Sequence, residues 1–302
     1  MLIHGRCRMS TQSVQVSHEF FPVATMRHAY LMCPPRFYDV NYVINPWMTG
    51  NLHATSSARA LEQWRSLYHA LRGIADVMLL EPQSGLPDMV FTANAGLEHN
   101  GIVILSSFRH IERQPEENFF RRWFSSRGYT IIEFPREISF EGEGDALFSN
   151  DHSLLWAGYG MRTTKESHAF LSRSLNIEVV SLQLVDPRFY HLDTCFAPLA
   201  DGYILYYPPA FGTASLARIE DYYPMAKRIP VSEEDACNFA CNAINLDRTI
   251  LLNNVSEKLR ERLETAGFQM ISLALDEFLK AGGAAKCLVM QLNHPAIPMG
   301  KT

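Results

Sequence analysis

The chain has 302 residues, of which 47% are hydrophobic and 20% charged, a globular composition long enough for one large domain or two modest ones. Its formal net charge is -5 and it carries no Lys/Arg cluster, which argues against nucleic acid as a partner. No apolar run approaches the roughly 18 residues of a membrane-spanning helix, so we expect no membrane partner either.

The N-terminal segment differs from the rest of the chain. Residues 1–26 show little periodicity and no clear targeting pattern, so we expect a tail followed by one folded domain over residues 27–302. The six cysteines are scattered and no secretory signal precedes them, which favours a reduced, cytoplasmic protein. Cys237 and Cys241 could share a helix face, but no second ligand pair follows, and we expect core cysteines rather than a metal site.

A repeated succession of elements begins after the tail. The first unit is irregular, with a strand in "HAYLMCPP", a helix over about residues 58–72 and a strand in "DVMLLEP". Four further units each predict a β-hairpin across a Gly, Asn or Asp turn, followed by a helix and another strand. Their hairpins begin near residues 88, 145, 193 and 240, a spacing typical of repeat architectures.

The four regular units can be read directly from the residues. Their hairpins are "MVFTANAG-LEHN-GIVILSSF", "DALFSN-DHS-LLWAGYG", "TCFAPL-ADG-YILYYPP" and "ACNAIN-LDR-TILLNN". Their helices are "PEENFFRRWFSSRG", "KESHAFLSRSL", a weaker stretch over residues 215–223, and "EKLRERLETAG". Thr163 and Glu166 have the spacing of a capping box for the second helix, and Ser256 and Gly267 can begin and end the last one.

The final strand, "AAKCLVMQL", has no helix after it and is expected to return to the first unit and complete its hairpin. The pattern therefore predicts an α/β fold of five units around a pseudo-fivefold axis, closed by the two ends of the chain. Sheets on the inside and helices on the outside would leave a central pocket, lined by strand ends and the loops beside them.

Polar residues recur where the predicted strands enter this pocket. They are Asn94 in "FTANAG", Glu141 and Asp145 in "FEGEGD", His191 and Asp193 in "HLD", and Cys287 at the start of the last strand. Taken singly, the acidic motif could be a solvated loop, the His and Asp a structural hydrogen bond, and the cysteine a core residue. Together they suit nucleophilic attack on a cation, because carboxylates bind a guanidinium and a bound cation favours the thiolate.

These motifs resemble those of the guanidino-group-modifying, or pentein, superfamily over about residues 28–294. The resemblance implies a five-bladed α/β propeller and a catalytic set of Cys287, His191 and Glu141. It also implies a set of substrate contacts, namely Asn94, Asp193, Asp145, Asn45, Arg113 and Arg162. The two arginines would hold the substrate carboxylate, although Arg113 could instead be a solvated arginine, with Arg109 as its competitor.

One departure within the superfamily concerns Asn94. Arginine deiminases carry "FTRD" where this chain has "FTAN", and the chain is more similar to the arginine dihydrolase group. The motifs that carry this similarity are "INPWM", "FTANAG", "FEGxGD", "GYGxRT", "HLDTCF" and "CL". A carboxamide tolerates a neutral ureido product better than a carboxylate does, because it offers both a donor and an acceptor.

The resemblance therefore implies hydrolysis of L-arginine to L-ornithine, two ammonia and carbon dioxide through a covalent intermediate on Cys287. It implies no metal or organic cofactor. An arginine deiminase or a dimethylarginine dimethylaminohydrolase, each giving citrulline, stays open, as does an amidinotransferase. A non-catalytic pentein module is the alternative from another class, and the sequence leaves homo-oligomerisation open.

Overall fold

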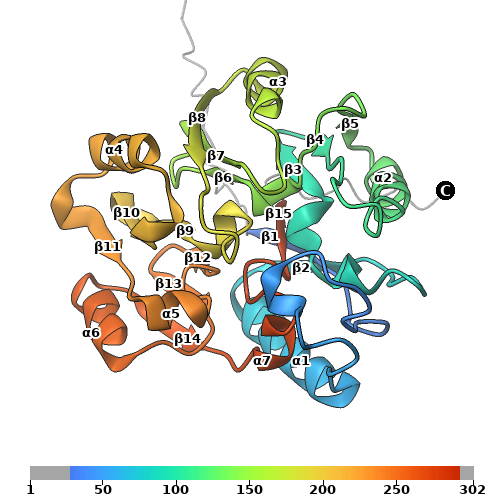
Figure 1. Cartoon of the computed structure of the whole chain (residues 1–302), viewed down its shortest axis with the longest axis horizontal. Coiled ribbons are helices and arrows are strands. Elements are labelled where there is room, and N and C mark those ends of the chain that lie inside the picture. Colours follow the sequence, from blue (N-terminus) through green and yellow to red (C-terminus); the bar gives the residue numbers. More distant parts are fainter. Residues whose placement is uncertain (1–27, 293–302) are drawn as a thin grey trace, which may run out of the picture.

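The computed structural model describes residues 28–292, so the tail expected over residues 1–26 lies outside the described part. Its strands form five three-stranded sheets. Figure 1 shows these sheets around a common centre, with the longer helices at the periphery. The longer helices are α1 (Ser57–Ile74), α2 (Glu116–Ser125), α3 (Glu166–Leu175), α4 (Thr213–Tyr222) and α6 (Glu257–Thr265). The predicted five-bladed α/β propeller is thus confirmed.

All five sheets have the same topology. The first two strands are antiparallel, and the third runs parallel to the second after a helical crossover. Four sheets consist of strands consecutive in the chain, namely β3 (Gly96–His99), β4 (Ile102–Leu105) and β5 (Thr130–Ile132); β6 (Ala146–Phe148), β7 (Leu154–Tyr159) and β8 (Glu178–Gln183); β9 (Phe196–Leu199), β10 (Tyr203–Tyr206) and β11 (Arg228–Pro230); and β12 (Ile244–Leu246), β13 (Thr249–Leu252) and β14 (Gln269–Ser272).

The fifth sheet joins the two ends of the described chain. It consists of β15 (Met290–Leu292), β1 (Ala29–Met32) and β2 (Asp76–Leu79). β15 pairs antiparallel with β1, with Ala29 opposite Leu292, so the last strand completes the first hairpin as predicted. Between residues 28 and 292, no helix combines the length and apolarity of a bilayer-spanning segment.

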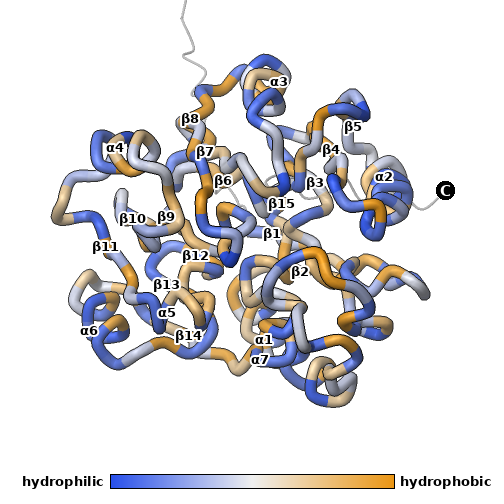
Figure 2. Tube along the Cα trace, in the orientation of Figure 1, coloured by the Kyte–Doolittle hydropathy of each residue, from blue (hydrophilic) through white to orange (hydrophobic). Residues whose placement is uncertain are grey.

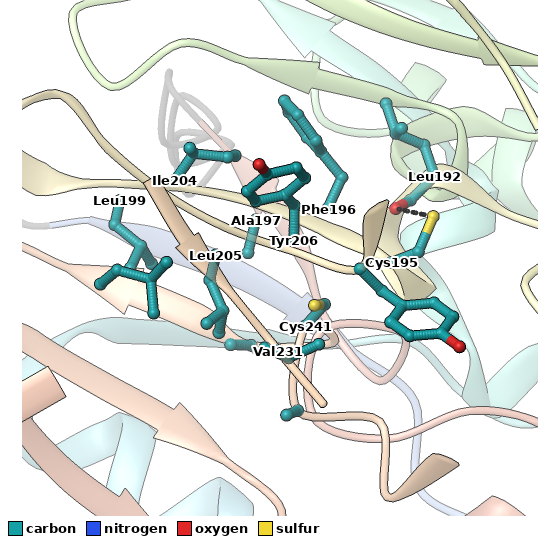
Figure 3. Close-up of a cluster of buried hydrophobic side chains, with 14 of the residues drawn as sticks. Leu192, Cys195, Phe196, Ala197, Leu199, Ile204, Leu205, Tyr206, Val231 and Cys241 are labelled. Atoms are coloured by element: carbon teal, nitrogen blue, oxygen red, sulfur yellow. Dashed lines mark hydrogen bonds between the residues drawn. The ribbon is translucent and has the colours of Figure 1, made fainter. Parts of the chain in front are cut away.

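Apolar side chains between the sheets and the helices form the core. Figure 2 shows hydrophilic residues concentrated on outer helices such as α2 and α6. One buried cluster surrounds β9 and β10 and includes Phe196 and Leu205 (Figure 3). Cys241 belongs to this cluster, as expected. Cys237 instead ends the short helix α5 (Glu233–Cys237) and is only partly buried, with Nη1 of Arg188 3.9 Å from its sulfur.

The segment predicted as a strand before Asn94 is not a strand. It forms two 3₁₀ turns, Pro87–Val90 and Thr92–Ala95, and β3 begins only at Gly96. The hydroxyl oxygen of Thr92 lies 2.8 Å from the carbonyl oxygen of Leu31 and 3.0 Å from that of Leu288. These contacts with β1 and with the turn before β15 override the local preference for extended backbone, and they place the Asn94 side chain in the interior.

Two further local predictions are wrong for a similar reason. Cys287 does not start the last strand but lies in a turn that precedes β15. Thr163 does not form a capping box with Glu166, because α3 begins without a side-chain cap. The Thr163 hydroxyl instead donates to Oδ2 of Asp145 at 2.7 Å and accepts from the backbone N–H of Glu141 at 3.1 Å. Its hydrogen bonds therefore serve the interior of the ring rather than a helix end.

Candidate active site

Five of the predicted site residues line one cavity, although they are far apart in the chain. They are Asn45, Asn94, Arg113, Arg162 and Cys287. Each has at most 7% of its surface exposed. Water is therefore largely excluded, and hydrogen bonds and charge interactions among these groups are stronger than they would be at the surface.

The carboxamide of Asn94 is held on both sides. Its Nδ2 donates to the carbonyl oxygen of Glu141 at 2.9 Å, and its Oδ1 accepts from Nη1 of Arg113 at 2.8 Å. These partners fix the orientation of the carboxamide, because a carbonyl must face the nitrogen and a guanidinium must face the oxygen. One N–H and one lone pair of the carboxamide remain for another group.

Arg113 lies inside the protein and is not the solvated arginine that the sequence also allowed. Its Nε and Nη2 donate to Glu116 at 3.0 and 2.8 Å, and Nη2 also reaches the carbonyl oxygen of Asp88 at 3.1 Å. Its competitor Arg109 is exposed, and Nη1 of Arg109 donates to the carbonyl oxygen of Met161. The cavity wall thus contains Arg113, with most of its donors already engaged.

Arg162 is less fully engaged than Arg113. Its Nη1 donates to Oε2 of Glu141 at 2.8 Å and its Nη2 to the carbonyl oxygen of Ile44 at 3.0 Å. The guanidinium stacks on the ring of Tyr190, with 4.6 Å between its central carbon and the ring centroid. Asn45 is used locally, since its Nδ2 donates to the carbonyl oxygen of Ala281 and its Oδ1 caps a short 3₁₀ turn.

Glu141 and His191 form a buried pair. Oε2 of Glu141 lies 2.8 Å from Nε2 of His191, and neither side chain is more than 2% exposed. Burial alone would raise the pKa of Glu141, but Arg162 and the hydrogen bond from His191 hold it well below its usual range. Glu141 is therefore ionised and orients the imidazole.

Asp145 lies next to this pair, and the residues that line the cavity do not include Glu141, His191, Asp193 or Asp145. Its Oδ2 accepts from Thr163, its Oδ1 accepts from the backbone N–H of Leu192 at 3.0 Å, and its distance to Nε2 of His191 is 3.9 Å. His191 and Asp193 are not on a strand, because a 3₁₀ turn over Leu192–Thr194 follows His191. The structure thus places Asp145 as a support for that turn.

The sulfur of Cys287 contacts two polar side chains. The thiol donates to Oδ2 of Asp193 at 3.3 Å, and Nδ2 of Asn242 donates to the sulfur at 3.0 Å. Burial and the neighbouring Asp193 raise the pKa of the thiol well above its usual value. Burial also raises the pKa of Asp193 to about 6, although Lys286 opposes the shift. No hydrogen bond joins this sulfur to His191.

Three site residues were not identified from the sequence. Asp88 and Tyr190 line the cavity, and Asn242 contacts the sulfur. Asp88 directly precedes "MVFTANAG", which the sequence predicts as the first strand of a hairpin. Its Oδ2 accepts from the Tyr42 hydroxyl at 2.9 Å, whereas its Oδ1 is buried without a hydrogen-bond partner among the described residues.

The acidic motif "FEGEGD" is buried and is not a solvated loop. Glu141 faces His191, whereas Glu143 pairs with Nζ of Lys286 at 2.8 Å and accepts from the backbone N–H of Gln291. Glu143 is only 4% exposed. Within residues 28–292, no group of three or more His, Cys, Asp or Glu side chains could hold a metal ion.

Known proteins resemble the chain along most of its length. Residues 40–294 match a family model described as N,N dimethylarginine dimethylhydrolase, eukaryotic. The bifunctional arginine dihydrolase/ornithine cyclodeaminase ArgZ of Synechocystis sp. is 54% identical over 268 residues, which cover 89% of this chain and 38% of ArgZ. An N(G),N(G)-dimethylarginine dimethylaminohydrolase of Mycobacterium tuberculosis is 42% identical over 267 residues, which cover 88% of this chain and 86% of that protein.

A solved structure extends this similarity to the fold. The crystal structure of the N-terminal domain of ArgZ, as a Cys→Ser mutant bound to substrate, matches with a TM-score of 0.88 and 53% identity. The match covers 89% of this chain and 100% of that domain. This chain therefore spans 38% of the length of the bifunctional relative and corresponds to its N-terminal domain.

The close packing around Asn94 gives a first prediction. Gly144→Ala would place a Cβ in collision with Nδ2 of Asn94 and 3.1 Å from Nδ1 of His191. We expect it to lower the free energy of unfolding by about 1–3 kcal/mol, measured by urea unfolding. The control is Gly73→Ala in α1, where an added Cβ has no atom within 4 Å and should be neutral or stabilising. Equal stabilities of the two variants would contradict the packing described.

Proposed function

The chain belongs to the guanidino-group-modifying, or pentein, superfamily, and we propose that it hydrolyses L-arginine to L-ornithine, two ammonia and carbon dioxide. The observation that carries the proposal is a pair of buried carboxylate oxygens, Oδ1 of Asp88 and Oδ1 of Asp193, without hydrogen-bond partners among the described residues. Asp88 shares the cavity with Cys287, and Asp193 contacts the Cys287 sulfur. Oδ2 of Asp88 already lies 4.0 Å from Nε of Arg113, so only the second oxygen of each carboxylate lacks a partner among the described residues. Buried oxygens without partners are costly, and a guanidinium supplies the donors that they lack.

This arrangement changes how we expect the substrate to bind. The motifs of the sequence made both Glu141 and Asp193 candidate carboxylates for a guanidinium, but Glu141 is already shared by His191 and Arg162. We therefore propose that Asp88 and Asp193 hold the cationic groups of the substrate. Arg162, which retains donors without a partner among the described residues, would be the principal contact for the substrate carboxylate, with Arg113 and Asn45 in supporting roles.

The first hydrolysis begins with the thiol of Cys287. Binding of the cationic guanidinium beside the sulfur lowers the thiol pKa, and Oδ2 of Asp193 is placed to take the proton. The sulfur then bonds to the guanidino carbon, and the C–N bond breaks as His191 gives a proton to the departing ammonia. His191 next takes a proton from water, the water oxygen bonds to that carbon, and the C–S bond breaks to leave citrulline.

The second hydrolysis depends on retention of citrulline, whose ureido group is neutral. A carboxylate at position 94 would repel the ureido oxygen, whereas Asn94 keeps one N–H and one lone pair for it. The sulfur of Cys287 then bonds to the ureido carbon, and the C–N bond to the terminal nitrogen breaks as His191 gives a proton to the second ammonia. Water bonds to that carbon, the C–S bond breaks, and the N-carboxylate that results loses carbon dioxide to leave ornithine. The name of the bifunctional arginine dihydrolase relative supports this two-step reaction.

A dimethylarginine dimethylaminohydrolase is the second candidate. The matched family model and the mycobacterial relative favour it, and its reaction would end at citrulline. On either reading, residues 27–302 are the proposed catalytic domain and residues 1–26 the proposed tail. We also propose a cytoplasmic location, supported by the five free cysteines among the described residues.

Counting ammonia per arginine tests the proposed function. The purified protein is incubated with L-arginine, and we expect two ammonia and one ornithine per arginine consumed. One ammonia with citrulline would reject the two-step reaction, and release of dimethylamine from dimethylarginine would favour the second candidate. Cys287→Ser is the control that should abolish turnover, because its hydroxyl is a far weaker nucleophile than a thiolate. Substantial turnover by this variant would reject Cys287 as the nucleophile.

The role of Asn94 can be tested by replacing one heavy atom of its side chain. We expect Asn94→Asp to favour the cationic substrate over the neutral ureido product, so the ratio of ammonia to arginine should fall from two towards one while citrulline accumulates. The control is Asn118→Asp, the same change on an exposed position of α2, which should leave the ratio unchanged. An unchanged ratio in Asn94→Asp would show that the carboxamide does not decide the product.

A further inference from the structure

We infer that Asn242 is a further catalytic residue, which holds the loop of Cys287 in place and donates a hydrogen bond that stabilises its thiolate. The inference rests on the proposed role of Cys287 as nucleophile. It assigns a function to a fully buried side chain from the motif "ACNAIN", which the sequence indicated only as part of a hairpin.

The position of Asn242 in the ring is the first observation. Four of the five sheets place a site residue shortly before their first strand, namely Asn94 before β3, Glu141 before β6, His191 before β9 and Cys287 before β15. Asn242 occupies the corresponding position in the remaining sheet, before β12. In all five sheets, the segment that precedes the first strand therefore contributes at least one polar side chain to the site.

The acceptor side of Asn242 fixes the backbone around the sulfur. Its Oδ1 accepts from the backbone N–H groups of Ala284 at 3.0 Å and Cys287 at 3.1 Å. Its own carbonyl oxygen accepts from the backbone N–H of Lys286 at 3.2 Å. The loop is not regular structure, so these three hydrogen bonds from one residue supply much of what holds it in place.

The donor side of Asn242 faces the sulfur. Its Nδ2 lies 3.0 Å from Sγ of Cys287 and 3.1 Å from the carbonyl oxygen of Asp193. The carboxamide cannot be reversed, because its oxygen would then face a carbonyl oxygen and its nitrogen would face two N–H groups. The atom at the sulfur is therefore an N–H donor, and such a donor stabilises a thiolate more than a thiol.

The charge around the sulfur makes this donor important. The Asp193 carboxylate, 3.3 Å away, disfavours a negative sulfur, and the burial of Cys287 acts in the same direction. Asn242 opposes both effects without adding a charge that would compete with the substrate cation. The sulfur thus lies between an acceptor that can take its proton and a donor that can stabilise the resulting charge.

Asn245 provides a matched control in the same motif. Its Oδ1 accepts from the backbone N–H of Ala200 at 2.7 Å, and its Nδ2 donates to the carbonyl oxygens of Asp247 and Thr249. It contacts neither the sulfur nor the Cys287 loop through these bonds. The same substitution at Asn245 therefore changes an asparagine of the hairpin without changing the environment of the thiol.

The test measures the reactivity of Cys287 directly. Iodoacetamide alkylation of the Cys287 peptide is followed by mass spectrometry as a function of pH in Asn242→Asp, Asn242→Ala and Asn245→Asp. Asn242→Asp keeps an acceptor for the loop N–H groups, whereas Asn242→Ala removes the donor without adding charge. We expect both to move the midpoint to higher pH and to slow alkylation at pH 7 roughly 10- to 100-fold. Asn245→Asp should match the unsubstituted protein.

The outcomes distinguish an effect of Asn242 on the thiol from a purely structural role, and they test this inference separately from the proposed function. Circular dichroism identifies which variants fold, and a folded Asn242 variant with an unchanged alkylation midpoint would overturn the inference. Alkylation needs no substrate, so the inference is tested even if arginine is not hydrolysed. If arginine is hydrolysed, the Asn242 variants should lose kcat much more than they raise KM, because the donor acts on the sulfur rather than on the substrate. A change in KM alone would also count against the inference.

Discussion

The site depends on the interaction of the buried Glu141 carboxylate with Arg162 and His191. This carboxylate stays ionised although it is buried, because Arg162 and His191 both contact the same oxygen at 2.8 Å. Removing one partner of a buried charge costs about 3–5 kcal/mol, so these three groups are stable only together. The carbonyl oxygen of Glu141 also fixes Asn94. Groups from three consecutive units therefore hold fixed positions before a ligand arrives. Groups fixed in this way can stabilise a transition state without reorganising during the reaction.

The repeating pattern could be predicted from the sequence because it rests on local physics. Alternating strands, Gly, Asn and Asp turns and capped helices each need only a short stretch of chain, and Ser256 does cap α6 as predicted. The return of β15 to β1 could also be predicted, because a last strand without a helix needs a partner and the first unit lacks one. The ring of five sheets could thus be predicted from the expected elements and their order along the chain.

The details of the site could not be predicted, because they depend on distant partners. Asn94 was expected on a strand, but the hydroxyl of Thr92 donates to the carbonyl oxygens of Leu31 in β1 and Leu288 in the turn before β15. Asp88 was missed because a lone acidic residue before an apolar run carries no signal of burial. Asn242 was missed because the hairpin motif contains two asparagines, Asn242 and Asn245, and the sequence alone does not show which of them faces the site. Only the hydrogen bonds to the Cys287 loop distinguish the two asparagines.

The shared sheet of β15 and β1 has a consequence for how the protein is made. β1 is synthesised early, but its antiparallel partner leaves the ribosome some 260 residues later, since Ala29 pairs with Leu292. The cysteine and the strand that anchors it are therefore among the last parts of the described chain to appear. Throughout most of translation the growing chain therefore lacks the thiol of Cys287, which we propose as the nucleophile. On the proposed function, the chemistry becomes available only when the ring is whole, and a stalled or truncated product without Cys287 would be inert.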